Sequence, residues 1–240
     1  MSRSLKGNLS DHFRKNRDRQ LRETICSLPR SGEHLTILDL GGRVNYWSRV
    51  GYDFLIENNV RVTIQNLHES QIVRDPAAPE GLFDWSVGNA CALEYPVNSF
   101  DFCHSNSVIE HVGLWGDMQK FADETRRVAR AHYVQTPNFW FPIEPHFSAF
   151  PMNHWLPRPT RAELMCRMKL ATAGKAENIG KACQLVDSAR LLTASQMRYL
   201  FPDSSILYEK LTILTKSIIA IRIDHSHPPA QEMLRKDYNG

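Results

Sequence analysis

Four apolar segments of the chain end in glycines or in small polar residues. These turns are DLGG (39–42), NLH (66–68), GNA (88–90) and NS (106–107). Glycine lets a ligand approach the backbone closely, and Asp and Asn side chains offer hydrogen-bond acceptors. In an open parallel sheet, ligands bind outside the carboxyl ends of the strands, where the strand order reverses. We therefore expect the four turns to form one ligand-binding site.

The segments that must position these turns alternate between strands and helices. Strands are expected at LTILDL (35–40), VRVTIQNL (60–67), LFDWSVGNA (82–90), SFDFCHSNS (99–107) and AHYVQT (131–136). Helices are expected around 47–58 and over 108–129, the second with Phe121, Thr125 and Val128 facing inward and with an interruption near Gly113 or Gly116 left open. This alternation predicts an α/β fold in which helices cover both faces of a parallel sheet.

The last third of the chain has a different pattern. A helix is expected over 161–173, and TAGKAENIGKACQ (172–184) is loop-like. Thr193 is a good N-cap for a short helix in ASQMRYLF (194–201). The runs SSILYEKLTI (204–213) and KSIIAIRI (216–223) predict an antiparallel pair of strands that completes the sheet.

Three divisions of the chain are expected. Residues 1–34 form a basic N-terminal helical leader, whose cationic side chains are expected to face solvent rather than a phosphate-bearing partner. Residues 35–224 form the main domain, with an insertion at about 138–190 that serves as a helical and loop cover over the substrate. Residues 225–240 are expected to be a flexible tail.

The composition is that of an ordinary globular protein. Its 240 residues suit one α/β domain, and a net charge of +3 gives no global field that would favour nucleic acid. The five cysteines are scattered without a CxxC pair, which indicates a reducing compartment. The polar N-terminus does not resemble a signal peptide, and no apolar run reaches the roughly 18 residues of a membrane span. The sequence therefore predicts a cytoplasmic protein that is not inserted in a membrane.

The strand-end turns also occur in a recognisable order. ILDLGG (37–42) is followed at a suitable distance by GNACALEYPVNSFDFCHSNSVIEHV (88–112). Over residues 35–140 the chain thereby resembles the class I S-adenosylmethionine-dependent methyltransferases, most closely their type 11 branch. The resemblance implies a Rossmann-like, mostly parallel seven-stranded sheet with an antiparallel last strand. It also implies S-adenosylmethionine (SAM) as cofactor and methyl transfer as activity.

The resemblance gives the first turn a role in cofactor binding. Gly41 and Gly42 would let the backbone approach the methionine part of SAM, where a side chain would block it. Asp39 would position this loop or meet the cofactor's amino group through water. Arg43 and Asn45 stand beyond the second glycine, where a third glycine is usual, and either is a candidate for the cofactor's carboxylate.

The later turns would hold the adenosine part of SAM. Asn66 stands where the family usually has an acid that accepts from both ribose hydroxyls, and Asn89 stands where an Asp usually meets the adenine amino group. Asn is also a common turn residue, which is the alternative explanation for both. The remaining predicted contacts are Leu67, with Ala90 or Cys91, around the adenine, and Asn106 after the fourth strand.

Methyl transfer requires a nucleophile in line with the methyl carbon and, in some cases, a base. The predicted catalytic residues are His111 after the fourth strand, and Glu144 and His146 in QTPNFWFPIEPHFSAFPMNHWLP (135–157). The aromatic residues of that segment are suited to wall a pocket, with His146 as the preferred base. A buried hydrophobic lid is the alternative for this segment.

Glu110 and His111 also resemble part of the E-x-x-E-H metal site of quinone-type O-methyltransferases. Ser107 stands at the position of the first acid, so one ligand is missing and no metal is predicted. A helix-start pair, with the acid favoured by the helix dipole, is the alternative explanation for these two residues.

The favoured acceptor is a hydroxyl or an amine of a small molecule or a saccharide. The sequence NSVI (106–109) replaces the N/D-P-P-Y/F motif of base-amine methyltransferases, and no Pro-Cys pair occurs, which argues against nucleic acid. A protein substrate docked on the basic leader stays open. The competing class is a catalytically inactive methyltransferase-like binding or partner subunit, and the sequence does not determine the oligomeric state.

Overall fold

A computed structural model describes residues 3–29, 32–143, 150–168 and 174–223, with the backbone alone for residues 3–13. Its centre is a seven-stranded sheet in the order β3-β2-β1-β4-β5-β7-β6. The strands are β1 (Leu35–Leu40), β2 (Val60–Asn66), β3 (Phe83–Val87), β4 (Phe100–Asn106), β5 (Ala129–Pro137), β6 (Ser205–Leu211) and β7 (Leu214–Arg222). Strands β1 to β5 are parallel, and β7 runs antiparallel to both β5 and β6. The predicted fold class and the late strand pair are confirmed.

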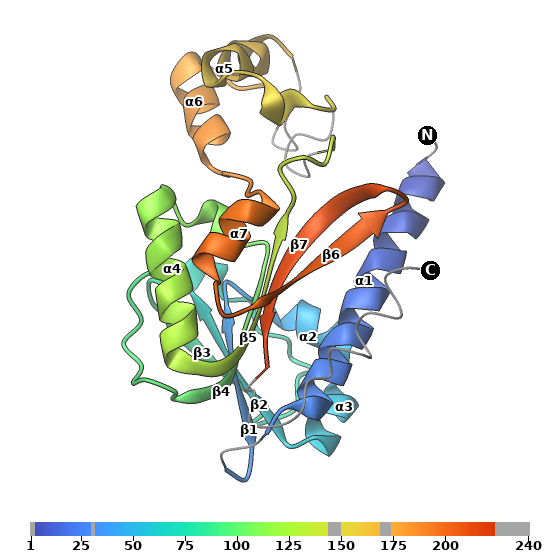
Figure 1. Cartoon of the computed structure of the whole chain (residues 1–240), viewed down its shortest axis with the longest axis vertical. Coiled ribbons are helices and arrows are strands. Elements are labelled where there is room, and N and C mark those ends of the chain that lie inside the picture. The colour runs from blue at the N-terminus through green and yellow to red at the C-terminus, as the bar shows by residue number, and fades with distance from the viewer. Residues whose placement is uncertain (1–2, 30–31, 144–149, 169–173, 224–240) are drawn as a thin grey trace.

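Helices cover both faces of the sheet (Figure 1). On one face lie α1 (Arg3–Ser27), α2 (Val44–Val50) and α3 (Tyr52–Glu57); on the other lie α4 (Trp115–Val128) and α7 (Ala194–Leu200). Alternation along β1 explains this division, because successive side chains of a strand point to opposite faces. Ile37 packs with the α1–α3 side, whereas Leu38 and Leu40 pack with α4. By the same alternation, Asp39 faces α2.

The predicted helices are present, with breaks that the backbone explains. The stretch expected at 47–58 is two helices, because Gly51 between them has a φ of +106°. The stretch expected over 108–129 begins as a short 3-10 turn, Ile109–His111, and continues as α4 after Gly113, whose φ is +129°. The buried residues of α4 include Phe121, Thr125 and Val128, as predicted, together with Met118 and Ala122.

The expectation of a loop over 172–184 was wrong in its second half. Helix α6 (Ile179–Asp187) begins there, because the side chain of Asn178 accepts the Lys181 N–H as an N-cap. Residues four apart on α6, Ala182 and Val186, pack against α5 (Arg158–Arg167). The pair forms a small lobe beyond the carboxyl ends of the parallel strands (Figure 1).

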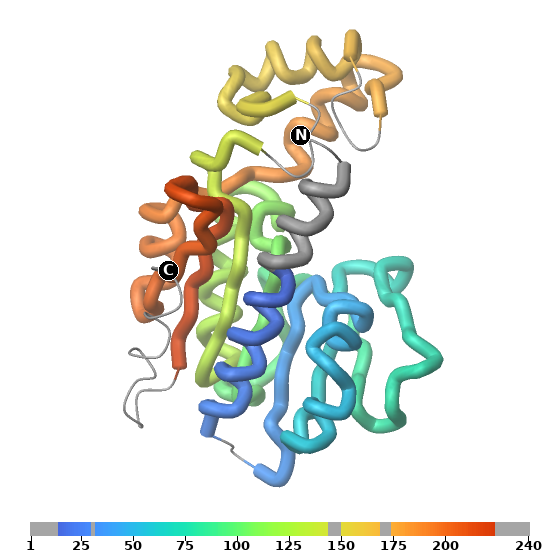
Figure 2. The backbone as a smooth tube through the Cα atoms, turned by 90° about the vertical axis from the view of Figure 1, so that its right-hand side faces the viewer, coloured from blue at the N-terminus to red at the C-terminus, as the bar shows by residue number. Residues whose placement is uncertain are grey.

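The N-terminal helix lies along the sheet rather than apart from it (Figure 2). Leu21 and Ile25 of α1 are 0% and 2% exposed and belong to the same core as β1 and α2. Thr193 caps α7 as predicted, by accepting the Gln196 N–H. In the described part of the chain, no helix combines the length and apolar character needed to cross a membrane. The predicted tail, 225–240, lies outside the described residues.

Candidate functional site

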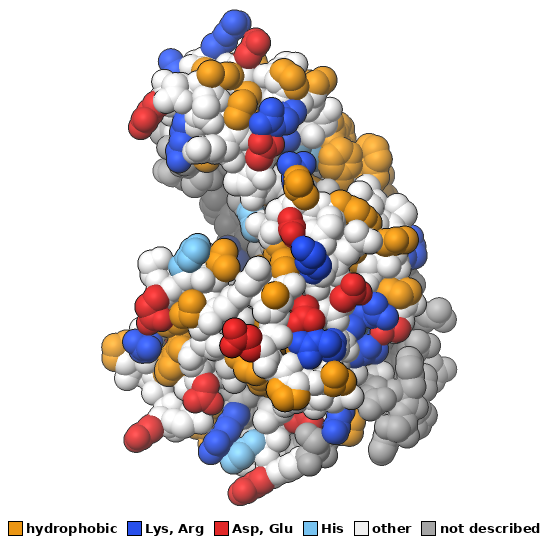
Figure 3. Space-filling model, turned by 90° about the vertical axis from the view of Figure 1, so that its left-hand side faces the viewer, with side chains coloured by type: hydrophobic (Ala, Val, Ile, Leu, Met, Phe, Trp, Pro, Cys, Tyr) orange, Lys and Arg blue, Asp and Glu red, His pale blue; other side chains and the backbone are white. Residues whose placement is uncertain are grey.

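A cavity of about 790 Å³ opens at the carboxyl ends of the parallel strands. The surface is hollowed between the α5–α6 lobe and the body of the molecule (Figure 3). The cavity is lined by every predicted cofactor-binding residue: Asp39, Gly41, Gly42, Asn66, Leu67, Asn89, Ala90 and Asn106. Residues from four separate strand ends thus meet in one hollow, as their positions in the sequence predicted.

The two glycines after β1 are required by the local geometry. Gly41 has a φ of +68°, and a Cβ there would lie 2.6 Å from Cγ2 of Val108. A Cβ on Gly42 would lie 1.7 Å from the Asp39 carboxylate. The Gly41 N–H donates to the Gln65 carbonyl on β2 at 2.8 Å, which holds the turn to the next strand. Side chains are therefore excluded from the part of the cavity floor nearest β1.

Asp39 binds its own protein through both carboxylate oxygens. Oδ2 accepts the indole N–H of Trp47 on α2 at 2.7 Å, and Oδ1 lies 2.7 Å from Nδ1 of His104 on β4. Both Asp39 and His104 are 1% exposed, and the His104 ring stacks on Tyr133. Of the two roles predicted for Asp39, this geometry supports positioning of the loop. His104 was missed because nothing in the local sequence pairs it with Asp39.

Asn66 presents an acceptor to the cavity. Its Nδ2 donates to the Gly42 carbonyl at 3.1 Å. A carbonyl can only accept, so this bond fixes which way the amide faces and directs Oδ1 elsewhere. Leu67 follows with 53% of its surface exposed and lines the cavity.

Asn89 is engaged in its own turn. Its Oδ1 accepts the Cys91 N–H at 2.9 Å, two residues further on, in the manner of an Asx turn. This is the turn role that the sequence left open as the alternative. The same oxygen retains a second lone pair, and Asn89 and Ala90 both line the cavity.

Asn106 belongs to a polar cluster between the ends of β4 and β5. Its Oδ1 accepts from Nη1 of Arg17 at 3.2 Å, and the Ser107 hydroxyl donates to Oε1 of Gln135 at 3.0 Å. Ser107 has a φ of +58°, a left-handed conformation that is uncommon outside glycine and concentrates at functional sites. The cluster therefore joins the N-terminal helix to the carboxyl edge of the parallel strands.

Arg17 corrects the expectation that the basic side chains of the leader face solvent. Its side chain is 14% exposed, and Nε lies 3.0 Å from Oε1 of Glu209 on β6. Burial is the largest single influence and lowers the pKa of Arg17, but Glu209 together with Tyr133, Tyr46 and Asp18 outweighs it, so the pKa is raised. Arg14 and Lys216 line the cavity beside it. The basic composition of the leader was the only signal for this arrangement, and it did not indicate which cations turn inward.

His111 lines the cavity and has a defined tautomer. Nδ1 lies 2.6 Å from the Ser188 carbonyl, which can only accept, so Nδ1 carries the proton. The basic lone pair of the neutral ring is then on Nε2. The other two predicted catalytic residues, Glu144 and His146, lie outside the described residues.

Two further groups singled out in the sequence have structural partners. Glu110 is 1% exposed and accepts from the Thr136 hydroxyl at 3.0 Å, while the neighbouring His111 is exposed. His154 binds the Phe139 carbonyl through Nε2 at 2.8 Å, next to a separate hollow of about 220 Å³ beside the α5–α6 lobe. Among the described residues, no group of three or more His, Cys, Asp or Glu side chains is placed to hold a metal.

Comparison with known proteins adds a family match and three similar structures. Residues 49–132 match the family model described as a methyltransferase domain. A SAM-dependent methyltransferase from Methanosarcina mazei has a TM-score of 0.50 at 16% identity, over 80% of this chain and 94% of that one. The CMeT domain of the citrinin polyketide synthase has a TM-score of 0.56 at 12% identity, over 88% of this chain and 52% of that one.

A variant of LepI in complex with SAH and a substrate analogue gives a TM-score of 0.51 at 10% identity, over 85% of this chain and 46% of that one. The chain thus spans about half the length of the LepI and citrinin synthase structures. A comparison with curated proteins gave no match. At these identities the structures show the fold, and the family match adds the activity class. Residues 49–132 thus match a methyltransferase domain, within a seven-stranded sheet that has the fold of SAM-dependent methyltransferases.

Proposed function

We propose that this protein transfers a methyl group from SAM to a hydroxyl or an amine of a small molecule or a saccharide. The observation that carries the proposal is the convergence of Gly41, Asn66 and the end of β4 on one cavity of about 790 Å³. Ligand pockets commonly measure about 300–1,000 Å³, so this volume suits a cofactor together with a small acceptor.

The turns after β1, β2 and β3 fit the parts of SAM. The bare backbone at Gly41 admits the methionine part, which a Cβ would exclude. Oδ1 of Asn66 is positioned to accept from a ribose hydroxyl, since Nδ2 is held by the Gly42 carbonyl. Leu67 and Ala90 offer apolar surface to the adenine. Asn89 uses its second lone pair for the adenine amino group.

Bound SAM supplies an electrophilic methyl carbon on a sulfonium sulfur, so the acceptor gains a methyl group, loses a proton, and leaves S-adenosylhomocysteine (SAH). The protein must therefore orient the acceptor and take up its proton. His111 is suited to the second task, because its Nδ1–H···Ser188 bond places the basic lone pair on Nε2. His146 and Glu144, which lie outside the described residues, remain predicted catalytic residues.

The wall beyond β4 suits a hydroxylated acceptor. Asn106, Ser107, Gln135 and Ser217 line it with amide and hydroxyl groups. Such groups both donate and accept, as recognition of a sugar or another polyol requires. This polar wall supports a small molecule or a saccharide as acceptor.

Two measurements test the proposal. Calorimetry should detect binding of SAM and SAH to the full chain. Mass spectrometry of candidate acceptors incubated with isotopically labelled SAM should detect the mass of one methyl group in place of one hydrogen. Absence of both signals with millimolar cofactor would refute the proposal.

A non-catalytic binding or partner subunit is the second candidate. Asn66 in place of an acid offers the ribose a weaker, uncharged acceptor, and Oδ1 of Asn89 already accepts within its own turn. Under this alternative, SAH gives no heat of binding and no thermal shift. Heat with SAH but no methylated product would point to a protein that keeps the cofactor without the reaction.

A further inference from the structure

Apolar side chains line the cavity beyond the turns that fit the cofactor. Val108 and Val112 follow β4, and three more come from the end of β5 and the segment after it: Pro137, Phe141 and Ile143. We propose that this apolar wall binds the body of the methyl acceptor, a small molecule that carries its reacting hydroxyl on an apolar ring, as a phenol does. The inference rests on the proposed function and narrows its acceptor, because it excludes a saccharide.

The order of the strands places the apolar wall on the acceptor side of the cavity. Strands β4 and β5 lie on the far side of β1 from β2 and β3, and the turns after β1, β2 and β3 are those that fit the parts of SAM. Because β4 and β5 pair in parallel, their carboxyl ends open at the same edge as those turns. Cγ2 of Val108 lies 2.6 Å from the position that a Cβ on Gly41 would take. The apolar wall therefore begins next to the turn proposed for the methionine part of SAM, which carries the methyl group.

The outer part of the apolar wall is accessible within the hollow. Ile143 is 38% exposed and Val112 is half-buried, and both line the cavity. Phe141 is 7% exposed, and its N–H donates to the Asn138 carbonyl at 3.0 Å, which holds the inner part in place. Apolar surface gains free energy when a ligand removes it from water, and ligand pockets commonly combine an apolar lining with a few polar groups. The wall therefore suits a ligand with an apolar face.

The polar groups beside the apolar wall are bonded to one another. Nη1 of Arg17 donates to the side-chain carbonyls of Asn106 and Gln135 at 3.2 and 3.5 Å. The Ser107 hydroxyl lies 3.3 and 3.0 Å from the same two oxygens. A carbonyl oxygen has two lone pairs, so these contacts occupy both acceptors. The hydroxyls of a saccharide would find these carbonyls engaged, whereas a single reacting hydroxyl needs only a donor for its oxygen and a base for its proton.

The proton chemistry of the reaction also favours a phenol. Methyl transfer to a hydroxyl forms an O–CH3 bond and breaks the S–CH3 bond of SAM, whose electron pair stays on sulfur, while the hydroxyl proton passes to a base. Imidazole has a pKa of about 6.5, a phenol has one of about 10, and water, the simplest model of an aliphatic hydroxyl, has one of about 15.7. The pKa difference from imidazole is thus about 3.5 for a phenol and about 9 for water. A histidine base such as His111 therefore takes a proton more readily from a phenol than from a sugar hydroxyl.

The test measures the binding of two neutral probes, 4-methylphenol and methyl glucoside, to the full chain saturated with SAH. Calorimetry should show that 4-methylphenol binds more tightly than methyl glucoside. We expect Val112→Ala and Ile143→Ala each to weaken the binding of 4-methylphenol by about tenfold or more, since one methylene more or less in an apolar pocket has an effect of about 10-fold to 200-fold. Both variants should keep the SAH affinity of the wild type, which shows that they are folded.

Ile213→Ala is the matched control, because Ile213 is 90% exposed in the turn between β6 and β7. It should bind 4-methylphenol as tightly as the wild type does. Tighter binding of methyl glucoside, or no binding of 4-methylphenol to the wild type, would overturn the inference. So would an affinity for 4-methylphenol that is unchanged in both wall variants, or that falls equally in the control. In each of these cases SAH still binds and the proposed function stands. Failure of SAH to bind even the wild type refutes the proposed function, and the inference falls with it.

Discussion

The carboxylate of Asp39 shows how a single residue shapes the cofactor edge. It joins Trp47 on α2 to His104 on β4, and its proximity to Gly42 leaves no room for a Cβ there. Because the protein uses both oxygens, the proposed site leaves direct contact with SAM to the glycine backbone and to Asn66. Its contacts indicate that Asp39 positions the loop.

Replacement of Gly41 should block the cofactor. In Gly41→Ala the new Cβ meets Val108 at 2.6 Å, and forcing it in costs about 1–3 kcal/mol, so we expect the affinity for SAH to fall about tenfold or more. Gly81→Ala is the control, because Gly81 has a similar φ of +76° but nothing within 4 Å of its Cβ. Calorimetry should show that the Gly81→Ala variant binds SAH as tightly as the wild type does. If both variants bound SAH with the same affinity, the β1 turn would not be part of the cofactor site.

Replacement of His111 should affect turnover and leave cofactor binding intact. General-base catalysis contributes about 100-fold to 10,000-fold, so His111→Gln should lower kcat by about 100-fold or more with the acceptor identified by mass spectrometry. The Kd for SAH should stay the same. His34→Gln, just before β1 at the opposite edge of the sheet, is the control. A His111→Gln enzyme of normal kcat would leave the role of base to His146.

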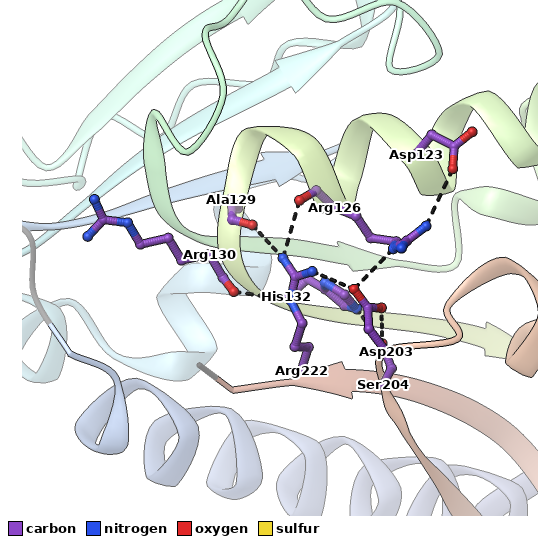
Figure 4. A network of polar contacts seen from close by, with 8 residues as sticks. All are labelled: Asp123, Arg126, Ala129, Arg130, His132, Asp203, Ser204 and Arg222. Atoms are coloured by element: carbon purple, nitrogen blue, oxygen red, sulfur yellow. Dashed lines mark hydrogen bonds and ion pairs between the residues drawn. The ribbon is translucent and has the colours of Figure 1, made fainter. Parts of the chain in front are cut away.

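At the scale of elements, a charged network fastens α4, β5 and β7 together away from the cavity (Figure 4). Arg222 on β7 donates to the carbonyls of Ala129 and Arg126 at 2.7 and 3.2 Å, and pairs with Asp203 at 2.6 Å. It thereby satisfies carbonyls that the end of α4 leaves without helical partners. His132 on β5 lies inside this network, with Nε2 2.7 Å from the Ser204 hydroxyl.

The buried His132 should make stability depend on pH. Burial first, and then the charge of Arg222, lowers its pKa to about 3, opposed by Asp203. Below about pH 6.5 the unfolded chain binds a proton that the folded protein does not, so the free energy of unfolding falls as the pH drops from about 6.5 towards 3. One such group contributes at most about 1.4 kcal/mol per pH unit.

Urea denaturation of the full chain at several pH values between 4 and 7 measures this dependence. The free energy of unfolding of His132→Gln should depend less steeply on pH than that of the wild type. This expectation holds whatever the free energy of unfolding of the variant at pH 7. The depressed pKa of Asp203 contributes a slope of the same sign at lower pH, and it stays in both proteins. Parallel curves for variant and wild type would show that His132 binds protons equally in both states.

At the scale of the whole molecule, α1 links the start of the chain to both the core and the cavity. Leu21 and Ile25 are buried with β1 and α2, while Arg17 reaches Asn106 and Glu209. A helix with these contacts is expected to be part of the folding unit, although the sequence predicted a separate leader over 1–34.

Truncation of Leu21 tests whether the leader is an independent part. Leu21 is 0% exposed, so Leu21→Ala should lower the free energy of unfolding by about 2–5 kcal/mol, with a single cooperative transition in urea. Glu23→Ala, at an exposed position of the same helix, should change it by no more than about 0.5 kcal/mol. A Leu21→Ala protein as stable as Glu23→Ala would favour a separate leader.

The sequence by itself determined the sheet and the location of the cavity. Alternating apolar strands, glycine turns and caps such as Thr193 are local signals, and the carboxyl ends of neighbouring parallel strands must meet at one edge. Gly41, Asn66 and Asn106 could therefore be predicted to line one hollow without any knowledge of side-chain directions.

The tertiary structure alone decided which side chains act together in that hollow. Arg17 and Lys216 lie near opposite ends of the chain, and Asp39 and His104 on different strands, so no local period relates them. Helix α6 has its own N-cap in Asn178, but its packing partner, α5, is set only by the tertiary structure. Contacts between distant residues depend on how elements pack, whereas periodicity and turn chemistry report only the conformation of each element.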